Sequence, residues 1–377
     1  MFRKLASILL VLALFLFLTG CETKTGAKSE NKSESKGKVT QSELKKDTVL
    51  IAHVIMNPGC PQVLINQEDS IFTNRLKKLG TKVKFTFTRS LDNVYPLLDK
   101  GEPDFFYLPN SAFTTYITET SKFGGSNEYA IVAGSLDWNI ISLVTRPEIK
   151  SFKDLDGKKV GIANLRYSDE YQLNEVLSTV GLKISSMGGT VEVVWDDVAA
   201  KLIDNYGNGK YDAITNFTGD NLPVALKKVP GSNVFSLNPD DLFGKIQPRT
   251  WLVVKKDLIK NNPELVKEVL KAHIVSTDRA KARTDKLPTI NRDLYINYFK
   301  EQNADMSDVL AKHPLEEYNK RWKEVGITYD PNMEYVTGVF DFMDKRGLVK
   351  GKKLDDFVQI DLLNEALKEM GKPVIKE

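Results

Sequence analysis

The chain has 377 residues, of which 41% are hydrophobic and 27% charged, so it can bury a large core and permits two domains of ordinary size. Its formal net charge of +3 includes Arg3 and Lys4, and without these two the chain holds 51 basic and 50 acidic residues. A near-neutral balance without a basic stripe argues against a nucleic-acid partner.

The amino terminus predicts a cleaved targeting signal. Arg3 and Lys4 precede an apolar run at residues 8–18, which is shorter than the about 20 apolar residues needed to span a bilayer. The run ends in the sequence LTGC at residues 18–21, which resembles the lipobox of bacterial lipoproteins. That resemblance implies a lipoprotein signal peptide at residues 1–20 and lipid attachment to Cys21, the alternative being an ordinary secreted protein with a coincidental cysteine.

Residues 21–47 predict a disordered tether. They are rich in Lys, Ser, Glu, Gly and Thr and hold almost no large apolar residue, so they cannot bury enough surface to fold. A flexible coil of about 26 residues has a root-mean-square reach on the order of 28 Å. Cys60 is the only cysteine besides Cys21, so we expect no disulfide within the folded chain.

The folded part begins with alternating strand and helix patterns. An apolar run at residues 48–55 favours a buried parallel strand, and Asn110 is placed to cap a later helix. The expected order is strand 48–55, helix 62–79, strand 83–87, helix 91–98, strand 103–108 and a helix from residue 110, a βαβαβα unit.

Two more strands, at residues 129–133 and 140–145, precede the most informative stretch. Ser151 and Asp154 have capping-box spacing, residues 159–163 read as a short strand, and apolar residues then recur at helical spacing until Gly181. Residues 164–168 are therefore predicted to be the loop between this strand and helix. Unpaired backbone N–H groups at a helix start favour an anion or a polar group, and Arg166 would add a full charge, unless it is an ordinary solvated loop residue.

Residues 151–182 resemble the DLxGKKVGV…LxxxLxxxGL segment that opens the second lobe of periplasmic solute-binding proteins. The resemblance is strongest to the nitrate, sulfonate and taurine binding family of ABC importers. It implies an α/β protein with the two-lobe type 2 periplasmic binding protein fold, in which two doubly wound lobes enclose an interlobe cleft.

The remaining chain fits that expectation. A second alternating set continues through strand 190–195, helix 198–206 and strand 211–216, and residues 265–363 are helical in period with no strand expected. Carried over to this chain, the resemblance predicts a first lobe at residues 48–145, a second lobe at 146–240, and the rest of the first lobe, mostly helical, at 241–377. The two crossings between lobes would fall near residues 141–145 and 235–253.

Ligands of open α/β sheets bind outside the carboxyl ends of the strands, so the candidate ligand-binding residues follow strands or lie near the crossings. Arg166 and Arg249 could hold an oxyanion through two hydrogen bonds, and Trp251 could pack on an apolar part. The full candidate set is Asn57, Cys60, Asn110, Ser111, Ser135, Arg166, Tyr167, Ser168, Asn216, Thr218, Arg249 and Trp251.

Most of these candidates also have a structural explanation. Asn110 and Ser168 could simply cap helices, and the turn from Asn57 could be a tight turn without a ligand. Trp251 could belong to the core, and Cys60 could be a small buried residue.

Catalytic and metal-binding patterns are absent from the sequence. It holds no GxSxG, Walker, HExxH or paired-cysteine motif, and its three histidines, His53, His273 and His313, are scattered. We therefore expect no catalytic residue, no metal and no cofactor.

The resemblance implies an extracytoplasmic, membrane-anchored binding protein that delivers a sulfonate-, taurine- or nitrate-like molecule to an ABC permease as a monomer. Alternatives are a pyrimidine-precursor binding protein related to thiamine supply, an enzyme recruited from the same fold, and a sensory or adhesion lipoprotein.

Overall fold

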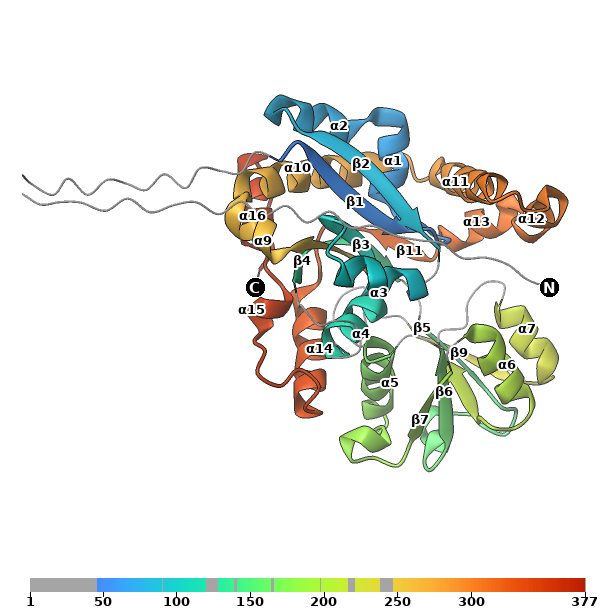
Figure 1. Ribbon diagram of the computed structural model, residues 1–377. Helices are drawn as coiled ribbons and strands as arrows, with labels where there is room; N and C mark the ends of the chain where they lie inside the picture. The colour runs from blue at the N-terminus through green and yellow to red at the C-terminus, as the bar shows by residue number, and fades with distance from the viewer. Residues whose placement is uncertain are drawn as a thin grey trace, which may run out of the picture. The chain divides into compact units, whose positions relative to one another are not determined.

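The strands of the computed structural model form two mixed sheets (Figure 1). The structure describes residues 46–89, 91–119, 128–138, 141–163, 166–196, 198–215, 221–237 and 247–376. The first sheet comprises β1 (Thr48–Val54), β2 (Lys82–Thr88), β3 (Phe105–Pro109), β4 (Tyr129–Trp138), β10 (Gln247–Lys255) and β11 (Val325–Ile327). The second comprises β5 (Ile141–Thr145), β6 (Lys159–Ala163), β7 (Glu192–Asp196), β8 (Ala213–Thr215) and β9 (Asn233–Leu237).

Both sheets share one plan, a parallel core with an antiparallel strand beside it. The first has the order β11-β4-β10-β3-β1-β2, in which β1 is parallel to β2 and β3 while β10 runs antiparallel to β3 and β4. The second has the order β7-β6-β8-β5-β9, in which β6 is parallel to β7 and β8 while β5 is antiparallel to β8 and β9. We call each sheet with its flanking helices a lobe, the first lobe having six strands and the second five.

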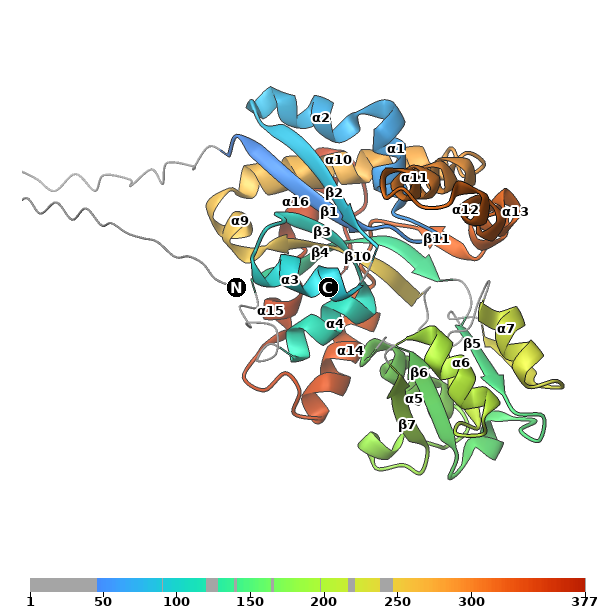
Figure 2. The same ribbon diagram turned by 45° about the vertical axis from the view of Figure 1, so that its right-hand side comes forward.

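Helices cover the sheets as the alternating pattern predicts. In the first lobe α1, α2 and α10 lie on one face of the sheet and α3 and α4 on the other (Figures 1 and 2). The helices up to residue 228 are α1 (Pro61–Asp69), α2 (Ile71–Leu76), α3 (Leu91–Asp99), α4 (Asn110–Thr118), α5 (Ser168–Ser178), α6 (Ala199–Gly207) and α7 (Asn221–Lys228). The later ones are α9 (Lys256–Asn261), α10 (Pro263–Lys281), α11 (Leu287–Glu301), α12 (Met306–Lys312), α13 (Leu315–Arg321), α14 (Met333–Lys345), α15 (Leu354–Phe357) and α16 (Asp361–Glu369). Short 3₁₀ turns lie at Lys77–Leu79, Phe152–Leu155 and Ser185–Met187.

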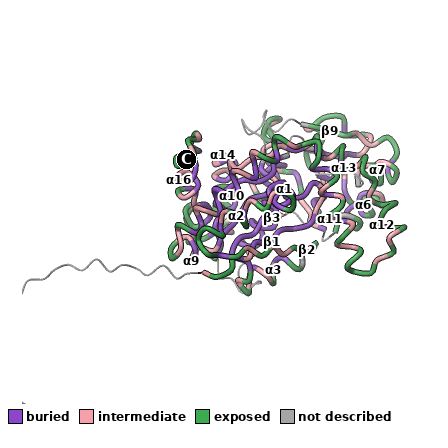
Figure 3. The backbone as a smooth tube through the Cα atoms, turned by 90° about the horizontal axis from the view of Figure 1, so that it is seen from above, coloured by how far each residue is buried: buried purple, intermediate pink, exposed green. Residues whose placement is uncertain are grey.

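The core follows the apolar runs of the sequence. All five residues of β3 are buried, and β1 is buried along most of its length (Figure 3). A strand that is covered on both faces needs apolar side chains at successive positions rather than at alternate ones. The strands expected at residues 48–55 and 103–108 are confirmed by β1 and β3.

The expected helix at residues 62–79 is divided in the structure. Ser70 adopts a left-handed conformation with φ 50°, which ends α1, and α2 starts immediately after it. Asn66 stabilises this break, because its carbonyl accepts from the backbone N–H of Ser70 and its side-chain oxygen accepts from that of Phe72. The apolar period continues across the break, so periodicity alone did not reveal it.

The expectation that no strand follows residue 265 is wrong. Val325–Ile327 forms β11, which pairs antiparallel with β4 at the edge of the first sheet. A three-residue strand is too short to show an alternating pattern, which explains the error.

The C-terminal helices return to the second lobe. Helix α14 packs against α5, and Gly338 of α14 lies so close to Tyr171 of α5 that a Cβ atom at residue 338 would come within 2.1 Å of the tyrosine oxygen. The glycine is therefore needed for this approach. The helical C-terminal part thus supplies a packing surface for the helix that follows β6.

Candidate functional site

The start of α5 carries the polar groups that the sequence singles out most strongly. The expected capping box before β6 is present, since Ser151 and Asp154 exchange hydrogen bonds, and β6 spans the predicted residues. Ser168 is the first residue of α5 rather than its cap, and Tyr167 holds the cap position with φ 62° and ψ −61°. A non-glycine residue with positive φ costs on the order of 1–3 kcal/mol and is typical of functional sites.

Ser168 is buried without a partner. Its exposed fraction is 0%, and its hydroxyl finds no hydrogen bond among the described residues. The alternative that Ser168 only caps the helix does not hold, because the start of α5 has no side-chain cap. A buried hydroxyl without a partner is costly, so it marks a place where a ligand group could bind.

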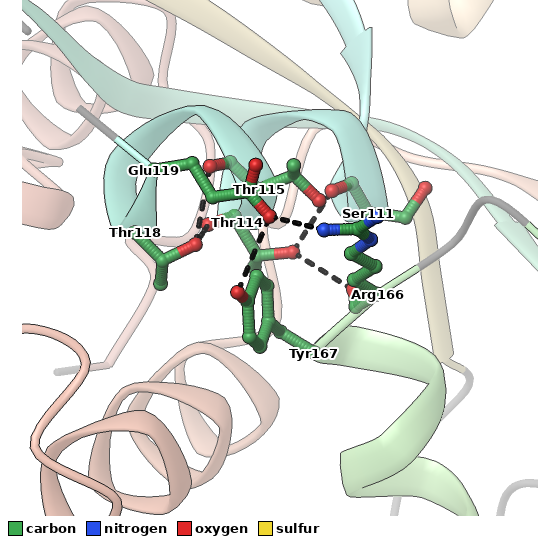
Figure 4. Close-up of polar contacts among 7 residues, drawn as sticks. All are labelled: Ser111, Thr114, Thr115, Thr118, Glu119, Arg166 and Tyr167. Carbon is green, nitrogen blue, oxygen red and sulfur yellow. Dashed lines mark hydrogen bonds and ion pairs between the residues drawn. The ribbon is translucent and has the colours of Figure 1, made fainter. Parts of the chain in front are cut away.

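Arg166 is held by an ion pair with Glu119, at the end of α4 (Figure 4). Its Nη1 lies 2.6 Å from Glu119 Oε1, and the guanidinium lies over the ring of Trp195 at 4.7 Å. The hydroxyl of Tyr167 donates to the same carboxylate oxygen at 3.4 Å, and Thr114 donates to the Arg166 carbonyl at 3.5 Å. Arg166 therefore joins the two lobes, and its charge is already matched within the protein.

A second ion pair lies one turn further along α5. The Glu170 carboxylate, with a side chain 1% exposed, lies 2.5 Å from Nη1 of Arg346 on the chain just after α14. Burial raises the pKa of Glu170, and the charge of Arg346 offsets that rise in part. A contact with the side chain of Trp195 also lowers the pKa of Glu170.

Asn110 and Ser111 lie at the start of α4, next to this region. Asn110 is the first residue of α4 and not its cap, because Pro109 occupies the cap position. Its amide donates to the carbonyl of Pro248 at 2.6 Å and to the hydroxyl of Tyr335 at 3.4 Å, and its oxygen accepts from the Ser111 N–H. Gln172 of α5 donates to the same Tyr335 hydroxyl at 2.8 Å, so this group connects α4, α5 and α14.

Cys60 and Ser135 belong to a separate polar cluster inside the first lobe. The Ser135 hydroxyl donates to Gln62 Oε1 at 2.6 Å and lies 3.4 Å from the Cys60 sulfur. Gln62 in turn donates to Thr277 at 2.9 Å and to the Thr328 carbonyl at 3.2 Å. Burial raises the pKa of the Cys60 thiol, which is therefore neutral at physiological pH and inert.

Asn57 lies in the turn after β1. Its side-chain oxygen is buried and finds no hydrogen bond among the described residues. Asn291 of α11 holds this turn, because it accepts from Gly59 N–H at 2.9 Å and donates to the Met56 carbonyl at 3.1 Å. The tail helices therefore contribute to the shape of a predicted ligand loop.

Arg249 and Trp251 are both on β10. Burial and the nearby charge of Arg321 lower the pKa of Arg249 to about 9, so it remains charged at neutral pH. Trp251 is 0% exposed, donates to the Pro331 carbonyl at 3.1 Å, and is enclosed by the rings of Phe113, Tyr335 and Phe357. Trp251 therefore belongs to the core, which was the alternative to a ligand contact for this residue.

The structure brings Arg166, Tyr167 and Ser168 together with the α4 end of the first lobe, and leaves Cys60 and Ser135 in their own cluster. Asn216 and Thr218 lie outside the described residues. Three residues that matter here had no signal in the sequence, because they come from segments distant from residues 166–170: Glu119, Trp195 and Arg346. Gln172, on α5 itself, was also missed.

In the described ranges no group of three or more His, Cys, Asp or Glu side chains could hold a metal ion. The described helices also include none that is both long and apolar enough to cross a membrane. The arrangement at α5 offers charges of both signs, aromatic faces and unpaired hydrogen-bonding atoms, which suits the binding of a small polar molecule.

The two sheets and their strand orders define the type 2 periplasmic binding protein fold, with a helical C-terminal part, as predicted. A family model described as NMT1/THI5 like matches residues 130–286. No curated protein matches the sequence.

Solved structures of solute-binding proteins share this fold. The periplasmic sulfonate-binding protein SsuA from Methylobacillus flagellatus KT is 18% identical with a TM-score of 0.59, over 88% of this chain and 98% of that chain. The aliphatic sulphonate binding protein SsuA from Escherichia coli is 14% identical with a TM-score of 0.57, over 83% and 92%. The nitrate-binding protein NrtA from Synechocystis PCC 6803 is 15% identical with a TM-score of 0.56, over 87% and 90%. The chain therefore resembles the nitrate and sulfonate binding proteins in fold.

Proposed function

We propose that the chain is an extracytoplasmic solute-binding lipoprotein of an ABC importer, which binds a small polar molecule between its lobes at the start of α5. The observation that carries this proposal is Ser168, whose fully buried hydroxyl has no partner among the described residues and lies next to the Arg166–Glu119 pair that joins the lobes. Buried polar groups that only support the fold have hydrogen-bond partners within the protein, whereas those of a binding site are left for the ligand. The fold supports the proposal, since similar structures include ligand-binding components of ABC transport systems.

The first candidate ligand is a small organic anion of the sulfonate, taurine or nitrate kind. Arg166 offers a planar guanidinium held against Trp195, which matches the oxygen atoms of such groups. Arg249 is a second, half-buried positive charge in the first lobe. We propose that the earlier candidates Asn57, Asn110, Ser111, Tyr167, Asn216 and Thr218 complete the site.

A neutral heterocycle, such as a pyrimidine precursor, is the second candidate. It is favoured by the charges around α5, because Glu119 neutralises Arg166 and Glu170 neutralises Arg346. A site without excess positive charge binds a neutral molecule at no electrostatic cost.

A thermal-shift screen over anions and heterocycles tests the proposal. A ligand that binds only the native state stabilises it by RT ln(1 + [L]/Kd), about 2.7 kcal/mol at a hundredfold excess over Kd. We expect at least one sulfonate, amino sulfonate, nitrate or pyrimidine to raise the melting temperature. No shift with any of them would contradict the proposal.

We further propose a binding role rather than catalysis. Among the described residues, the polar groups at α5 include no nucleophile paired with a base, and burial raises the pKa of the Cys60 thiol and keeps it neutral. An enzyme recruited from this fold is the alternative, and turnover of a screened ligand would establish it. The permease would receive the closed, loaded protein, which acts as a monomer.

The lipid anchor and the division into lobes belong to the proposal too. Residues 1–20, Cys21 and the tether up to residue 45 lie outside the described residues. The chain passes from β4 of the first sheet to β5 of the second and returns from β9 to β10, so we propose hinges near residues 141–145 and 235–253.

The anchor can be tested in cells. Two acyl chains are needed for stable membrane attachment, so we expect Cys21→Ser to release the protein or to leave its precursor uncleaved. Cys60→Ser is the matched control and should stay in the membrane fraction. Membrane attachment and processing of Cys21→Ser equal to wild type would contradict the anchor.

A further inference from the structure

Glu119 is paired through its carboxylate with the guanidinium of Arg166, the residue proposed to receive the acidic group of a ligand. Its carboxylate lies 2.6 Å from Arg166 Nη1, and it also accepts from the hydroxyl of Tyr167 (Figure 4). The two side chains of the pair are 27% and 14% exposed, so both are partly withdrawn from water. This geometry is the one that a bound carboxylate or sulfonate would adopt on a guanidinium.

The pair is held in place from several sides. Trp195 covers the face of the Arg166 guanidinium at 4.7 Å, and Thr114 of α4 donates to the Arg166 carbonyl. Glu119 directly follows α4, whose last turn is fixed by Thr118 bonding back to the Thr114 carbonyl at 2.8 Å. If the Arg166 guanidinium turned away, it would lose the Trp195 ring as well as Glu119. If the Glu119 carboxylate turned away, it would lose both Arg166 and the Tyr167 hydroxyl, so these contacts favour keeping the charge of Glu119 beside Arg166.

An acidic ligand must therefore compete with a charge that belongs to the protein. It either displaces Glu119 from Arg166 or binds next to it and suffers repulsion between like charges. A neutral ligand that uses the Ser168 hydroxyl or the Trp195 ring experiences neither effect. The site would therefore discriminate between ligands by their charge and not by their size.

We propose that Glu119 is a specificity-determining residue, an internal carboxylate that competes with acidic ligands for Arg166 and weakens the binding of simple anions. This inference rests on the proposed function, since it concerns the same site. The two residues of this ion pair then have opposite effects on the affinity for an acidic ligand. Arg166 raises that affinity by attracting the acidic group, and Glu119 lowers it by competing for the same guanidinium.

The test compares one anion with a neutral molecule of similar size. The probes are sodium methanesulfonate and dimethyl sulfone, titrated by NMR or calorimetry into wild type and Glu119→Gln. The glutamine keeps a hydrogen-bonding oxygen for Arg166 and removes the charge. We expect methanesulfonate to bind about tenfold more tightly to Glu119→Gln, and the affinity for dimethyl sulfone to stay within about twofold.

Two controls make the result specific. Glu148→Gln removes an exposed charge and alters the net charge equally, so it should leave both affinities unchanged. Arg166→Gln combined with Glu119→Gln should lose the gain, because no guanidinium is left to be released. Circular dichroism and the melting temperature establish that each variant is folded.

Three results would overturn the inference. They are an unchanged or weaker affinity of Glu119→Gln for methanesulfonate, an equal gain for dimethyl sulfone, or a gain that persists without Arg166. Absence of methanesulfonate binding in every variant overturns it as well. The proposed function fails separately, when no solute of the screen binds wild type.

Discussion

Two buried polar clusters of this protein differ in how fully their hydrogen bonds are used. In the cluster of Cys60, Gln62, Ser135 and Thr277, the Ser135 hydroxyl and both ends of the Gln62 amide have protein partners. At the start of α5 the Ser168 hydroxyl has none among the described residues. Both serines are 0% exposed, so burial does not distinguish them.

The difference separates scaffold from site. A buried polar group that is fully bonded stabilises one arrangement of helices and strands, here α1, β4 and α10. A buried polar group left open costs stability, and such a cost is typical of binding sites. Candidate ligand-binding residues from the sequence lie in both clusters, and only their hydrogen bonds in the structure distinguish the two roles.

The largest expected effect on stability comes from the ion pair between Glu170 and Arg346. Arg346→Met leaves Glu170 buried without its counter-charge, and removal of one partner from such a pair costs about 3–5 kcal/mol at neutral pH. Urea denaturation followed by circular dichroism measures this change. Lys345→Met alters an exposed neighbour and should have almost no effect.

The loss of stability caused by Arg346→Met should depend on pH in a defined direction. Burial raises the pKa of Glu170 above the ordinary value of 4.5, so the folded state binds the proton more readily than the unfolded state. The contribution of Glu170 to stability therefore falls as pH rises from 4.5 through its folded pKa, and without Arg346 that fall is steeper. The destabilisation of Arg346→Met should shrink as the pH approaches 4.5. A pH-independent loss, or one below about 1 kcal/mol at neutral pH, would contradict this description of the pair.

A smaller loss of stability is expected in the cluster of Cys60, Gln62, Ser135 and Thr277. Ser135→Ala removes the donor to Gln62 Oε1 and leaves that oxygen buried without it, at a cost of about 1–3 kcal/mol. The affinity for a ligand identified in the screen should stay within about twofold of wild type. Chemical denaturation and calorimetry give the two numbers. A stable Ser135→Ala with weakened binding would place Ser135 in the site.

The smallest effect on stability is expected for the matched serine at α5. Ser168→Ala removes a buried hydroxyl that has no partner among the described residues, so it should not destabilise the protein and should raise the free energy of unfolding by up to about 1 kcal/mol. Ligand affinity should fall about five- to tenfold, the value of one hydrogen bond. If Ser168→Ala destabilises the protein as much as Ser135→Ala does, the contrast between the two clusters is lost.

Local features of the fold could be predicted from the sequence. The Ser151 and Asp154 capping box, strand β6 and the position of α5 follow from neighbours within one or two turns, where periodicity and capping are strong signals. The two-sheet architecture followed from the alternation of strands and helices and from the resemblance of residues 151–182 to a known family.

The partners of the site residues could not be predicted in this way. Glu119 pairs with Arg166 across 47 residues and Arg346 pairs with Glu170 across 176, and nothing local in either segment indicates the contact. Arg166 was expected to be open to an anion because its own loop shows only a positive charge. The balance of charge at the site depends on packing between lobes, which local patterns do not contain.

The most direct test of the central claim is hydrogen exchange, measured by mass spectrometry on wild type with and without the strongest ligand from the screen. Exchange reports which backbone amides a ligand protects, whatever the ligand's charge. We predict slower exchange in peptides that cover residues 166–172, with no comparable change in peptides from α11 to α13. Unchanged exchange at residues 166–172 under saturating ligand would contradict the claim that the start of α5 is the binding site.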